Sequence, residues 1–479
     1  MAFAIISLKS ANNNPYFRLD TSLLEQHRIS NILKNLREHG LEITTLNELG
    51  FQVWNPPRMA MKRLRLSKTG LKTLFVGVGI AKKISINLSK IEIGYVPNEN
   101  YLISEGYILA PETGEPACGY VFEGAIDALH SYYDDKPPLA ATHNLFRVTC
   151  ESCRKELKRY IALLLNTSIG LSIIGFAKYG ALQPHYRADI LAKTPIPLLE
   201  RGKHSELLNK ALDHEAKAWR AYFKAMKIVE EYLRVNVEQL SGTSSYKEMS
   251  VYGRLDSKFY VYLNALRRLP KAQILRANEL FDIKLGTAPR SREYKSLERG
   301  EPYVSYDAID DSGFIDEELF YRLPNPPRTT ARARRLSIPI TSVAHSIEGI
   351  GKVGILYPHD NMLCMTGLAI LNPSTAKLRS AAQKIGCLKE KTAEELMLYT
   401  FAILKSRLMR RVMQSLTYGL TAQISKKDIE SLPIPIIKDL LYSNVTSLVK
   451  EFIENMYKAN ALKRQSITEL ENYILRLLG

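Results

Sequence analysis

The sequence predicts a mixed α/β protein built from two tandem copies of one domain, each followed by a long helix, with the two helices pairing as an antiparallel coiled coil. Three observations favour this fold class. They are a repeat across the 479 residues, an apolar stripe after each copy, and a Gly/Ser/Thr-rich link between the copies. The chain is long enough for each domain to bury its own core.

The internal repeat is an ordered series of matches at nearly constant offset. The pairs are Arg18 with Arg254, Asn47 with Asn278, Pro57 with Pro289, and Tyr160 with Tyr399, at offsets of 236, 231, 232 and 239 residues. Each half closes on the same tripeptide, Pro195-Ile-Pro197 or Pro433-Ile-Pro435, at an offset of 238. Loops of different length explain the small changes of offset, so the series indicates duplication of one domain.

These matches set the predicted boundaries. The parts are an N-terminal extension (1–17), a first domain (18–199) with its helix (200–240), a linker (241–253), and a second domain (254–438) with its helix (439–479). Within the domains, β-branched and aromatic runs predict irregular strands at 72–80, 83–96, 301–309 and 351–357. Helical spacing is present at 156–167 and 394–414. Strands and helices do not alternate steadily, so a doubly wound sheet is not favoured.

After each Pro-Ile-Pro, apolar residues recur at steps of three, four and seven, which places them on one face of a long helix. The residues expected to pair the two helices are Leu212, Trp219, Tyr222, Met226, Val229, Leu233, Val445, Val449, Phe452, Met456, Leu470 and Ile474. In the alternative arrangement each helix packs only on its own domain. Ten helical turns span about 50 Å, which is longer than the face of a small domain, so pairing is favoured.

The charge of the chain predicts an anionic partner. Lys and Arg number 66 against 49 Asp and Glu, a formal charge of +17. Nucleic acid is favoured over an acidic protein or a membrane surface. No apolar run approaches the ~20 residues of a spanning helix, and the first ten residues do not resemble a signal peptide. An odd cysteine count fits a reducing cytoplasm, and the single Cys150-x-x-Cys153 predicts two ordinary thiols rather than a zinc site.

Two Asn-Pro-Pro segments raise the possibility of methyl transfer, because amino-methyltransferases hold the target base with Asn/Asp-Pro-Pro-aromatic. At both Asn55 and Asn325 the next residue is an arginine, Arg58 or Arg328, so the stacking ring is missing. A Phe-x-Gly-x-Gly cofactor signature at Phe75 lies only 20 residues after Asn55, which leaves no room for the intervening βαβ units. No P-loop for ATP and no nuclease or hydrolase constellation is found.

The second copy resembles the specificity subunits of type I restriction-modification enzymes and the related target-recognition subunits of type II systems. The resemblance rests on "NELFDIKLGTAPRS", "GEPYVSYDAIDDSGFID" and "YGLTAQISKKDIESLPIPII". It extends over nearly the whole chain, although the first copy has no clear counterpart of 301–309. The family's chains carry two target recognition domains, each followed by a long helix.

The resemblance implies that each target recognition domain reads one half of a bipartite site in double-stranded DNA, while the helices separate the domains and dock DNA adenine methyltransferase subunits. Those partner subunits would bring S-adenosylmethionine, and a restriction/translocase subunit would add ATP and Mg²⁺. In this interpretation the chain would not itself be an enzyme, would hold no cofactor and would be cytoplasmic. Two alternatives remain open: an autonomous methyltransferase/restriction enzyme with unrecognised motifs, and a basic adaptor of another defence complex.

Basic clusters are the candidate DNA surface, since Lys and Arg neutralise phosphates. The candidates are Arg58, Lys62, Arg63, Arg65, Lys68 and Lys72 in the first copy, and Arg290, Arg292, Lys295, Arg328, Arg332, Arg334 and Arg335 in the second. For any one of them a solvated surface charge is the competing interpretation. Gln183 and Gln423 have the chemistry to pair with adenine edges, but an amide beside a turn also caps backbone groups.

Overall fold

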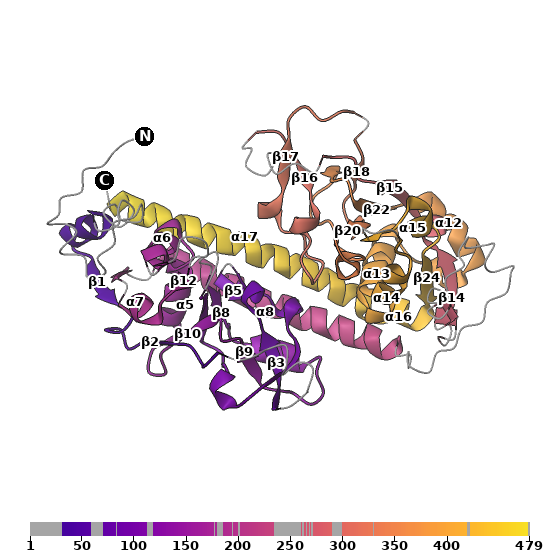
Figure 1. Cartoon of the computed structure of the whole chain (residues 1–479). Helices are drawn as coiled ribbons and strands as arrows, with labels where there is room; N and C mark the ends of the chain where they lie inside the picture. Colours follow the sequence, from indigo (N-terminus) through magenta and orange to yellow (C-terminus); the bar gives the residue numbers. More distant parts are fainter. Residues whose placement is uncertain are drawn as a thin grey trace. The chain divides into compact units, whose positions relative to one another are not determined.

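The computed structural model in Figure 1 divides into two compact units. It describes residues 31–58, 70–82, 84–112, 118–176, 178–179, 185–193, 195–199, 202–233, 272–289, 299–328, 330–418 and 422–477, with 260–269 in part. Unit 1 comprises Met1–Ala216 and Lys458–Gly479, and unit 2 comprises Lys217–Tyr457. The predicted N-terminal extension and the linker lie outside the described residues.

Unit 1 contains two sheets. The larger has the order β2 (Gln52–Trp54), β10 (Leu145–Thr149), β7 (Ile108–Pro111), β8 (Gly119–Tyr120), β5 (Ile84–Ile86) and β4 (Ala81–Lys82), and the smaller has β6 (Glu92–Val96), β3 (Leu71–Val76) and β9 (Leu139–Ala141). Two antiparallel pairs join β1 (Glu42–Thr45) to β13 (Pro195–Leu198) and β11 (Lys178–Tyr179) to β12 (His185–Tyr186). The shorter helices are α4 (Ala125–His130), α5 (Lys155–Leu164), α6 (Ser168–Phe176) and α7 (Ala188–Ala192).

Unit 2 also contains two sheets and two antiparallel pairs, but its sheets differ from those of unit 1 in their number of strands. One sheet has the order β15 (Phe281–Leu285), β22 (Leu368–Pro373) and β19 (Ile338–Thr341), and another has β17 (Tyr321–Leu323), β16 (Glu301–Val304), β21 (Met362–Cys364) and β18 (Arg332–Ala333). The pairs are β14 (Ala272–Arg276) with β24 (Pro433–Ile437) and β20 (Val343–Ala344) with β23 (Ala422–Gln423). The shorter helices are α11 (Ala277–Leu280), α12 (Thr375–Lys384), α13 (Ala393–Lys405), α14 (Arg407–Ser415), α15 (Lys426–Glu430) and α16 (Lys438–Tyr442).

The strand that closes each domain is held in the same way in both units. Strand β13 pairs with β1 so that Pro195 faces Thr45, and β24 pairs with β14 so that Pro433 faces Arg276. The two proline positions differ by 238 residues and their partners by 231, the same offsets that the repeat in the sequence gives. Proline has no N–H to donate to a ladder, but each strand of a two-stranded pair has an open edge where no donor is needed. Proline therefore destabilises these pairs little.

A counterpart of 301–309, which sequence comparison does not reveal in the first copy, exists in the structure. Strand β16 lies between antiparallel β17 and parallel β21, and β3 lies between antiparallel β6 and parallel β9. Strand β3 is therefore the equivalent strand. Its six residues, "LKTLFV", share the topology of β16 but none of the residues that carry the resemblance.

One strand prediction is wrong. Residues 351–357 form only an isolated bridge between Ile340 and Val353 rather than a strand. Their backbone hydrogen bonds are divided: Gly354 N–H donates to the carbonyl of Pro339, whereas Ile355 N–H donates to that of Gly313. The apolar residues that suggested a strand are buried, so burial of side chains without a continuous ladder produced the pattern.

Most of the other predicted elements are present. Helix α5 begins one residue before the predicted segment 156–167 and ends inside it. The predicted segment 394–414 forms two helices, α13 and α14, which are separated at Ser406. The extended backbone of Ser406 ends the first helix, and its hydroxyl accepts a hydrogen bond from the N–H of Met409 to begin the second. In the described part of the chain, no helix combines the length and apolarity needed to cross a membrane.

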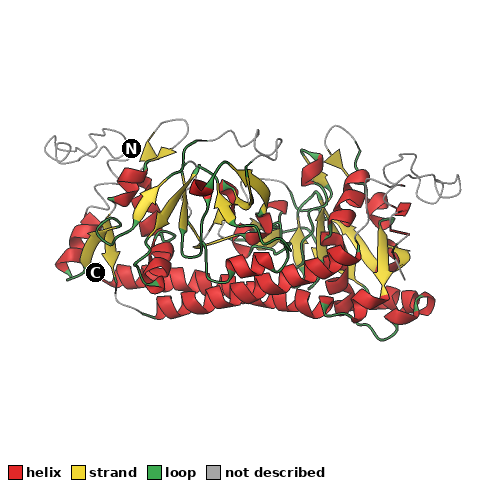
Figure 2. Cartoon of the chain, turned by 90° about the horizontal axis from the view of Figure 1, so that it is seen from below, coloured by secondary structure: helices red, strands yellow, loops and turns green. Residues whose placement is uncertain are grey.

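The two long helices, α8 (Lys203–Tyr232) and α17 (Val445–Leu477), lie side by side in both views (Figures 1 and 2). Within unit 2, the Phe452 ring lies 6.1 Å from Trp219 and 4.9 Å from Tyr222. Within unit 1, Lys203 meets Glu469. Also within unit 1, Glu215 meets Lys463, so residue numbers fall along α17 as they rise along α8, which is the antiparallel arrangement. All the predicted pairing residues are buried except Tyr222, which is half-buried.

Candidate nucleic-acid interface

The predicted DNA-contacting residues fall into two groups. Those outside the described residues are Lys62, Arg63, Arg65, Lys68, Gln183, Arg290, Arg292 and Lys295. The structure describes the other predicted residues, which are Arg58, Lys72, Arg328, Arg332, Arg334, Arg335 and Gln423. Their surroundings separate side chains that hold the fold from side chains that face solvent.

In unit 1, Arg58 lies at the end of a sheet and keeps its charge accessible. It follows β2, and its Nη2 lies 3.4 Å from Oε1 of Glu112, which follows β7. The Arg58 side chain is 79% exposed and that of Glu112 only 13%, so most guanidinium donors face solvent. Lys72 on β3 instead forms an ion pair with Asp135, and this hydrogen bond raises the pKa of Lys72 and lowers that of Asp135. Arg58 is therefore the stronger candidate for a phosphate contact.

A buried arginine beneath this edge was not predicted from the sequence. Arg147 in β10 is fully buried and donates to the carbonyls of Ala141, Thr142 and Leu145 at 2.6–2.8 Å. Its guanidinium lies 5.5 Å from the centre of the Trp54 ring, and burial lowers its pKa to about 10. Arg147 thereby fixes the turn between β9 and β10. An isolated arginine in a β-rich run carries no pattern that would reveal this role.

The turn that Arg147 fixes contains His143, whose ring is close enough to Glu112 and Arg58 to feel their charges. Burial is the main cause that lowers the pKa of His143; the Arg58 charge acts in the same direction and Glu112 opposes it. The imidazole is therefore favoured in its neutral form. A neutral imidazole has one donor and one acceptor, which is the hydrogen-bonding capacity that a base edge requires.

In unit 2, the Arg332 side chain has partners within its own domain. It lies on β18 and donates to both carboxylate oxygens of Glu301 on β16 and, at 3.0 Å, to the carbonyl of Asn361. The hydrogen bond lowers the pKa of Glu301 and raises that of Arg332. Strands β16 and β18 both pair with β21, so the ion pair spans the sheet across that strand. Its charge is engaged within the domain.

The neighbouring Arg334 lines a polar cavity of about 330 Å³. The other lining residues are Asn278, Phe281, Asp282, Ile283, Lys284, Asn372, Lys377 and Glu430. Lys377 lies 3.2 Å from Asp282, and Lys426 lies 3.4 Å from Glu430, so both acidic side chains have a cationic partner. The charges of Lys284 and Arg334 then dominate the cavity, which suits an anion such as a phosphate. Lys284 was not among the predicted residues.

The remaining described candidates have separate surroundings. The Arg335 guanidinium lies 5.3 Å from the centre of the Tyr357 ring, and its backbone N–H donates to Asp360. Gln423 is half-buried in β23, where its backbone bonds reciprocally with that of Tyr418. Arg328 is exposed in a turn. The arginines of the basic stretch 328–335 thus differ in their immediate contacts.

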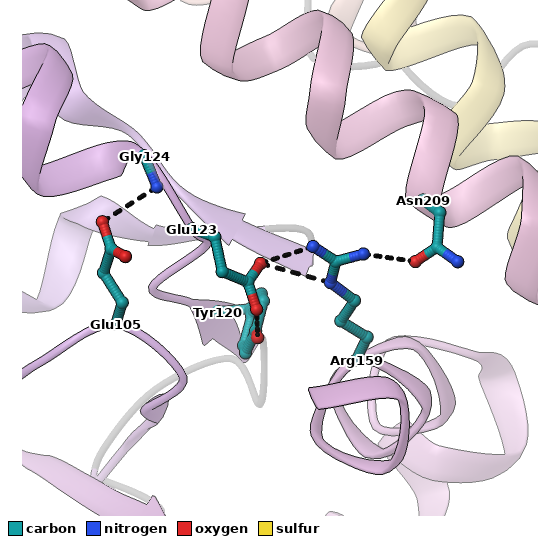
Figure 3. A network of polar contacts seen from close by, with 6 residues as sticks. All are labelled: Glu105, Tyr120, Glu123, Gly124, Arg159 and Asn209. Atoms are coloured by element: carbon teal, nitrogen blue, oxygen red, sulfur yellow. Dashed lines mark hydrogen bonds and ion pairs between the residues drawn. The ribbon is translucent and has the colours of Figure 1, made fainter. Parts of the chain in front are cut away.

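A polar network, shown in Figure 3, connects the first domain to α8. Arg159 on α5 donates to Oε2 of Glu123 at 2.6 Å and to Oδ1 of Asn209, on α8, at 2.5 Å. Tyr120 donates to the other oxygen of Glu123 at 2.8 Å. Burial raises the pKa of Glu123, but the bonds from Arg159 and Tyr120 outweigh it and the pKa is lowered. The carboxylate thus stays charged and holds domain and helix together.

The cysteines require a correction. Cys150 and Cys153 form a disulfide rather than two free thiols. The turn between β10 and α5 places their Cα atoms 5.3 Å apart, within the range that a disulfide spans. Across the described residues, no three His, Cys, Asp or Glu side chains form a group that could hold a metal ion.

No protein-family model matches the sequence, and a search of curated proteins finds no match. The similar solved structures include the following three. The type I restriction-modification S subunit from M. genitalium is 14% identical with a TM-score of 0.36, covering 91% of this chain and 96% of that one. The HsdS subunit from Thermoanaerobacter tengcongensis is 14% identical with a TM-score of 0.26, and the match covers 92% of this chain and 95% of that one. A chain from a structure concerning complex assembly and conformational transition of the type I R-M system is 15% identical with a TM-score of 0.26. That match covers 91% of this chain and 96% of the other.

Proposed function

We propose that this chain is the DNA-recognition subunit of a restriction-modification complex and is not itself catalytic. The observation that carries the proposal is the duplication of one domain whose closing strands and helices match while the surface charges do not. Lys284 and Arg334 face a cavity in unit 2, whereas unit 1 presents Arg58 beside Glu112 and His143. Two domains with one scaffold and different surfaces suit the reading of two different half-sites.

The partners follow from the same proposal. Each domain contacts double-stranded DNA, and the paired helices dock DNA adenine methyltransferase subunits, which bring S-adenosylmethionine. A restriction/translocase subunit adds ATP and Mg²⁺. The chain acts in the cytoplasm, where it meets its DNA. The motifs of the second copy and the net charge of +17 support this assignment.

The test is selection of binding sites from a random duplex library with the purified full chain, followed by sequencing. We expect two short conserved half-sites separated by a spacer of fixed length and random sequence. A single contiguous motif would contradict two-domain reading. Binding with no enriched sequence would favour the alternative of a basic adaptor.

A second measurement separates the enzymatic alternative. Calorimetry of the isolated chain with S-adenosylmethionine should show no binding, because both methyl-transfer signatures lack their required context. The structure places Asn55 directly after β2 and Asn325 after β17 with a positive φ of 48°, which is turn geometry. Micromolar binding together with methylation of DNA would instead identify an autonomous methyltransferase.

A further inference from the structure

The apolar stripe of α17 is interrupted by two polar residues that occupy core positions. Between Ala459 and Leu470 the stripe continues at Lys463 and Ser466, with the same steps of four and three residues. Both are buried: Lys463 is 7% exposed and Ser466 fully covered. A lysine is almost never this buried unless it is paired.

Lys463 joins three elements of unit 1. Its Nζ lies 2.7 Å from Oε2 of Glu215 on α8, and it donates to Oγ of Ser85 on β5 at 2.7 Å. The Ser85 hydroxyl in turn donates to Oε1 of Glu215 at 2.8 Å. Glu215 and Ser85 are 3% and 4% exposed, so the triad is closed to solvent. One turn along α17, the Ser466 hydroxyl donates to the His204 carbonyl at 2.6 Å.

The helix contact within unit 2 has the opposite character. There the Trp219 ring stacks 5.9 Å from Phe223 and lies 6.1 Å from Phe452. Val445, Val449 and Met456 continue the α17 stripe without a charge, and all three are buried. An apolar seam of this kind tolerates displacement by one heptad, because each apolar residue then meets another.

A buried ion pair does not tolerate that displacement. A slip of seven residues would place Met456 or Leu470 beside Glu215 and leave both charges buried without a partner. Breaking a buried pair in this way is strongly destabilising, whereas a fully apolar replacement of the pair is often neutral or stabilising. The polar network therefore makes the helix pair less stable than a fully apolar pair would be, but it allows only one register. A buried polar residue has the same effect in other coiled coils.

We propose that Lys463 is a positioning residue that fixes the register of the C-terminal half of α17 on α8 and on the sheet of the first domain. Only one register satisfies Glu215 and Ser85 together. That a fixed register gives a single spacing between half-sites on DNA rests on the proposed function. The fixed register itself does not rest on it.

The experiment measures register in the full chain with pairs of introduced cysteines and a short bismaleimide. K203C with E469C reports the native register, because the Lys203 and Glu469 side chains meet at 2.8 Å. K203C with R476C reports a slip of one heptad, about 10 Å along the helix. Each cysteine pair is placed in four backgrounds: parent, the apolar pair E215L/K463M, the reversed pair E215K/K463E, and L470M, an apolar control on the same stripe.

We expect the parent, the reversed pair and L470M to cross-link only in the native register, and E215L/K463M to yield both products. Cross-linking of E215L/K463M in the native register alone, or of the parent in both, would overturn the proposal. Loss of folded structure in E215L/K463M, measured by circular dichroism with L470M intact, would also overturn it, because an apolar pair should fold. Since no arm requires DNA, failure here is distinct from failure of the proposed function.

Discussion

The hydroxyl of Tyr399 donates a hydrogen bond to the carbonyl of Pro435 at 2.7 Å and accepts one from the N–H of Ile437 at 3.0 Å. Tyr160 makes the equivalent bond to the carbonyl of Pro197. In each unit a buried tyrosine on a helix thus anchors the strand from which the chain continues toward the long helix. The tyrosine and the closing tripeptide, which are the strongest matches of the sequence repeat, are bonded partners.

The first prediction concerns this anchor. Y399F removes the hydroxyl and leaves two buried backbone groups without a partner, so the free energy of unfolding should fall by about 1–2 kcal/mol. Urea denaturation of the full chain measures the change. Y418F is the matched control, because Tyr418 is 52% exposed. Equal stability of the two variants would show that the anchor contributes nothing.

The second prediction separates Arg332 from DNA binding. R332A should destabilise unit 2 by about 1 kcal/mol, a modest value because the ion pair with Glu301 is partly exposed. Adding E301A to R332A should lower the free energy of unfolding little further, because R332A already breaks the ion pair. Under conditions where R332A is folded, it should bind DNA like the parent. A specific loss of affinity without loss of stability would return Arg332 to the DNA surface.

The third prediction assigns the cavity of unit 2 to phosphate contact. If Lys284 and Arg334 each neutralise a phosphate, K284A/R334A should weaken DNA binding and reduce the slope of log affinity against log salt by about 1.8. Fluorescence anisotropy with duplex DNA at several salt concentrations gives both quantities. R379A/K389A removes the same charge from exposed positions of unit 2 and serves as the control. An unchanged slope for K284A/R334A would mean that the cavity does not face the DNA.

The fourth prediction is a pH dependence from His204, which is buried on the stripe of α8 beside the Tyr160 ring at 6.3 Å. Burial lowers its pKa in the folded state, with Glu469 opposing the shift. The folded protein then binds fewer protons than the unfolded chain, so stability is full above the unfolded value of about 6.5 and is lost as pH falls through the folded pKa. Thermal unfolding between pH 7 and 5 should show this loss. H204L should reduce it, while R379A should not.

The sequence predicts architecture well because architecture depends on spacing. The apolar stripes of α8 and α17 are periodic, and the Pro-Ile-Pro that closes each domain is repeated. The structure has a long helix at each stripe and a strand at each Pro-Ile-Pro. The sequence does not give the partner of a surface charge, so the roles of the predicted basic residues in DNA binding stay predictions. Arg332 and Arg334 are two residues apart in one basic run, yet Glu301 engages the first and the second lines a cavity.

Some residues could not be found by pattern at all. Lys463 occupies a stripe position, where a polar residue reads as an interruption of the helix face, and its partners Glu215 and Ser85 lie 248 and 378 residues away in sequence. Arg147 is similar, because it satisfies carbonyls of its own turn. The roles of such residues depend on contacts that are distant in sequence or lie in irregular turns. The periodicity of a single sequence carries no information about those contacts.

The last prediction uses the helices as a ruler between half-sites. The change of unit falls inside both helices, between Ala216 and Lys217 on α8 and between Tyr457 and Lys458 on α17. A heptad inserted in only one helix would leave the other too short and bury mismatched residues. Heptads inserted at both points keep each stripe in phase and lengthen the pair by about 10 Å.

Along B-DNA, about 10 Å corresponds to close to three base pairs, so site selection with the doubly extended chain should return the parent half-sites with a spacer about three base pairs longer. The half-site bases should not change, because neither domain is altered. A single insertion on α8 alone is the control and should lower stability without defining a new spacer. If the doubly extended chain folds and selects the parent spacer, the helices do not set the distance between the half-sites.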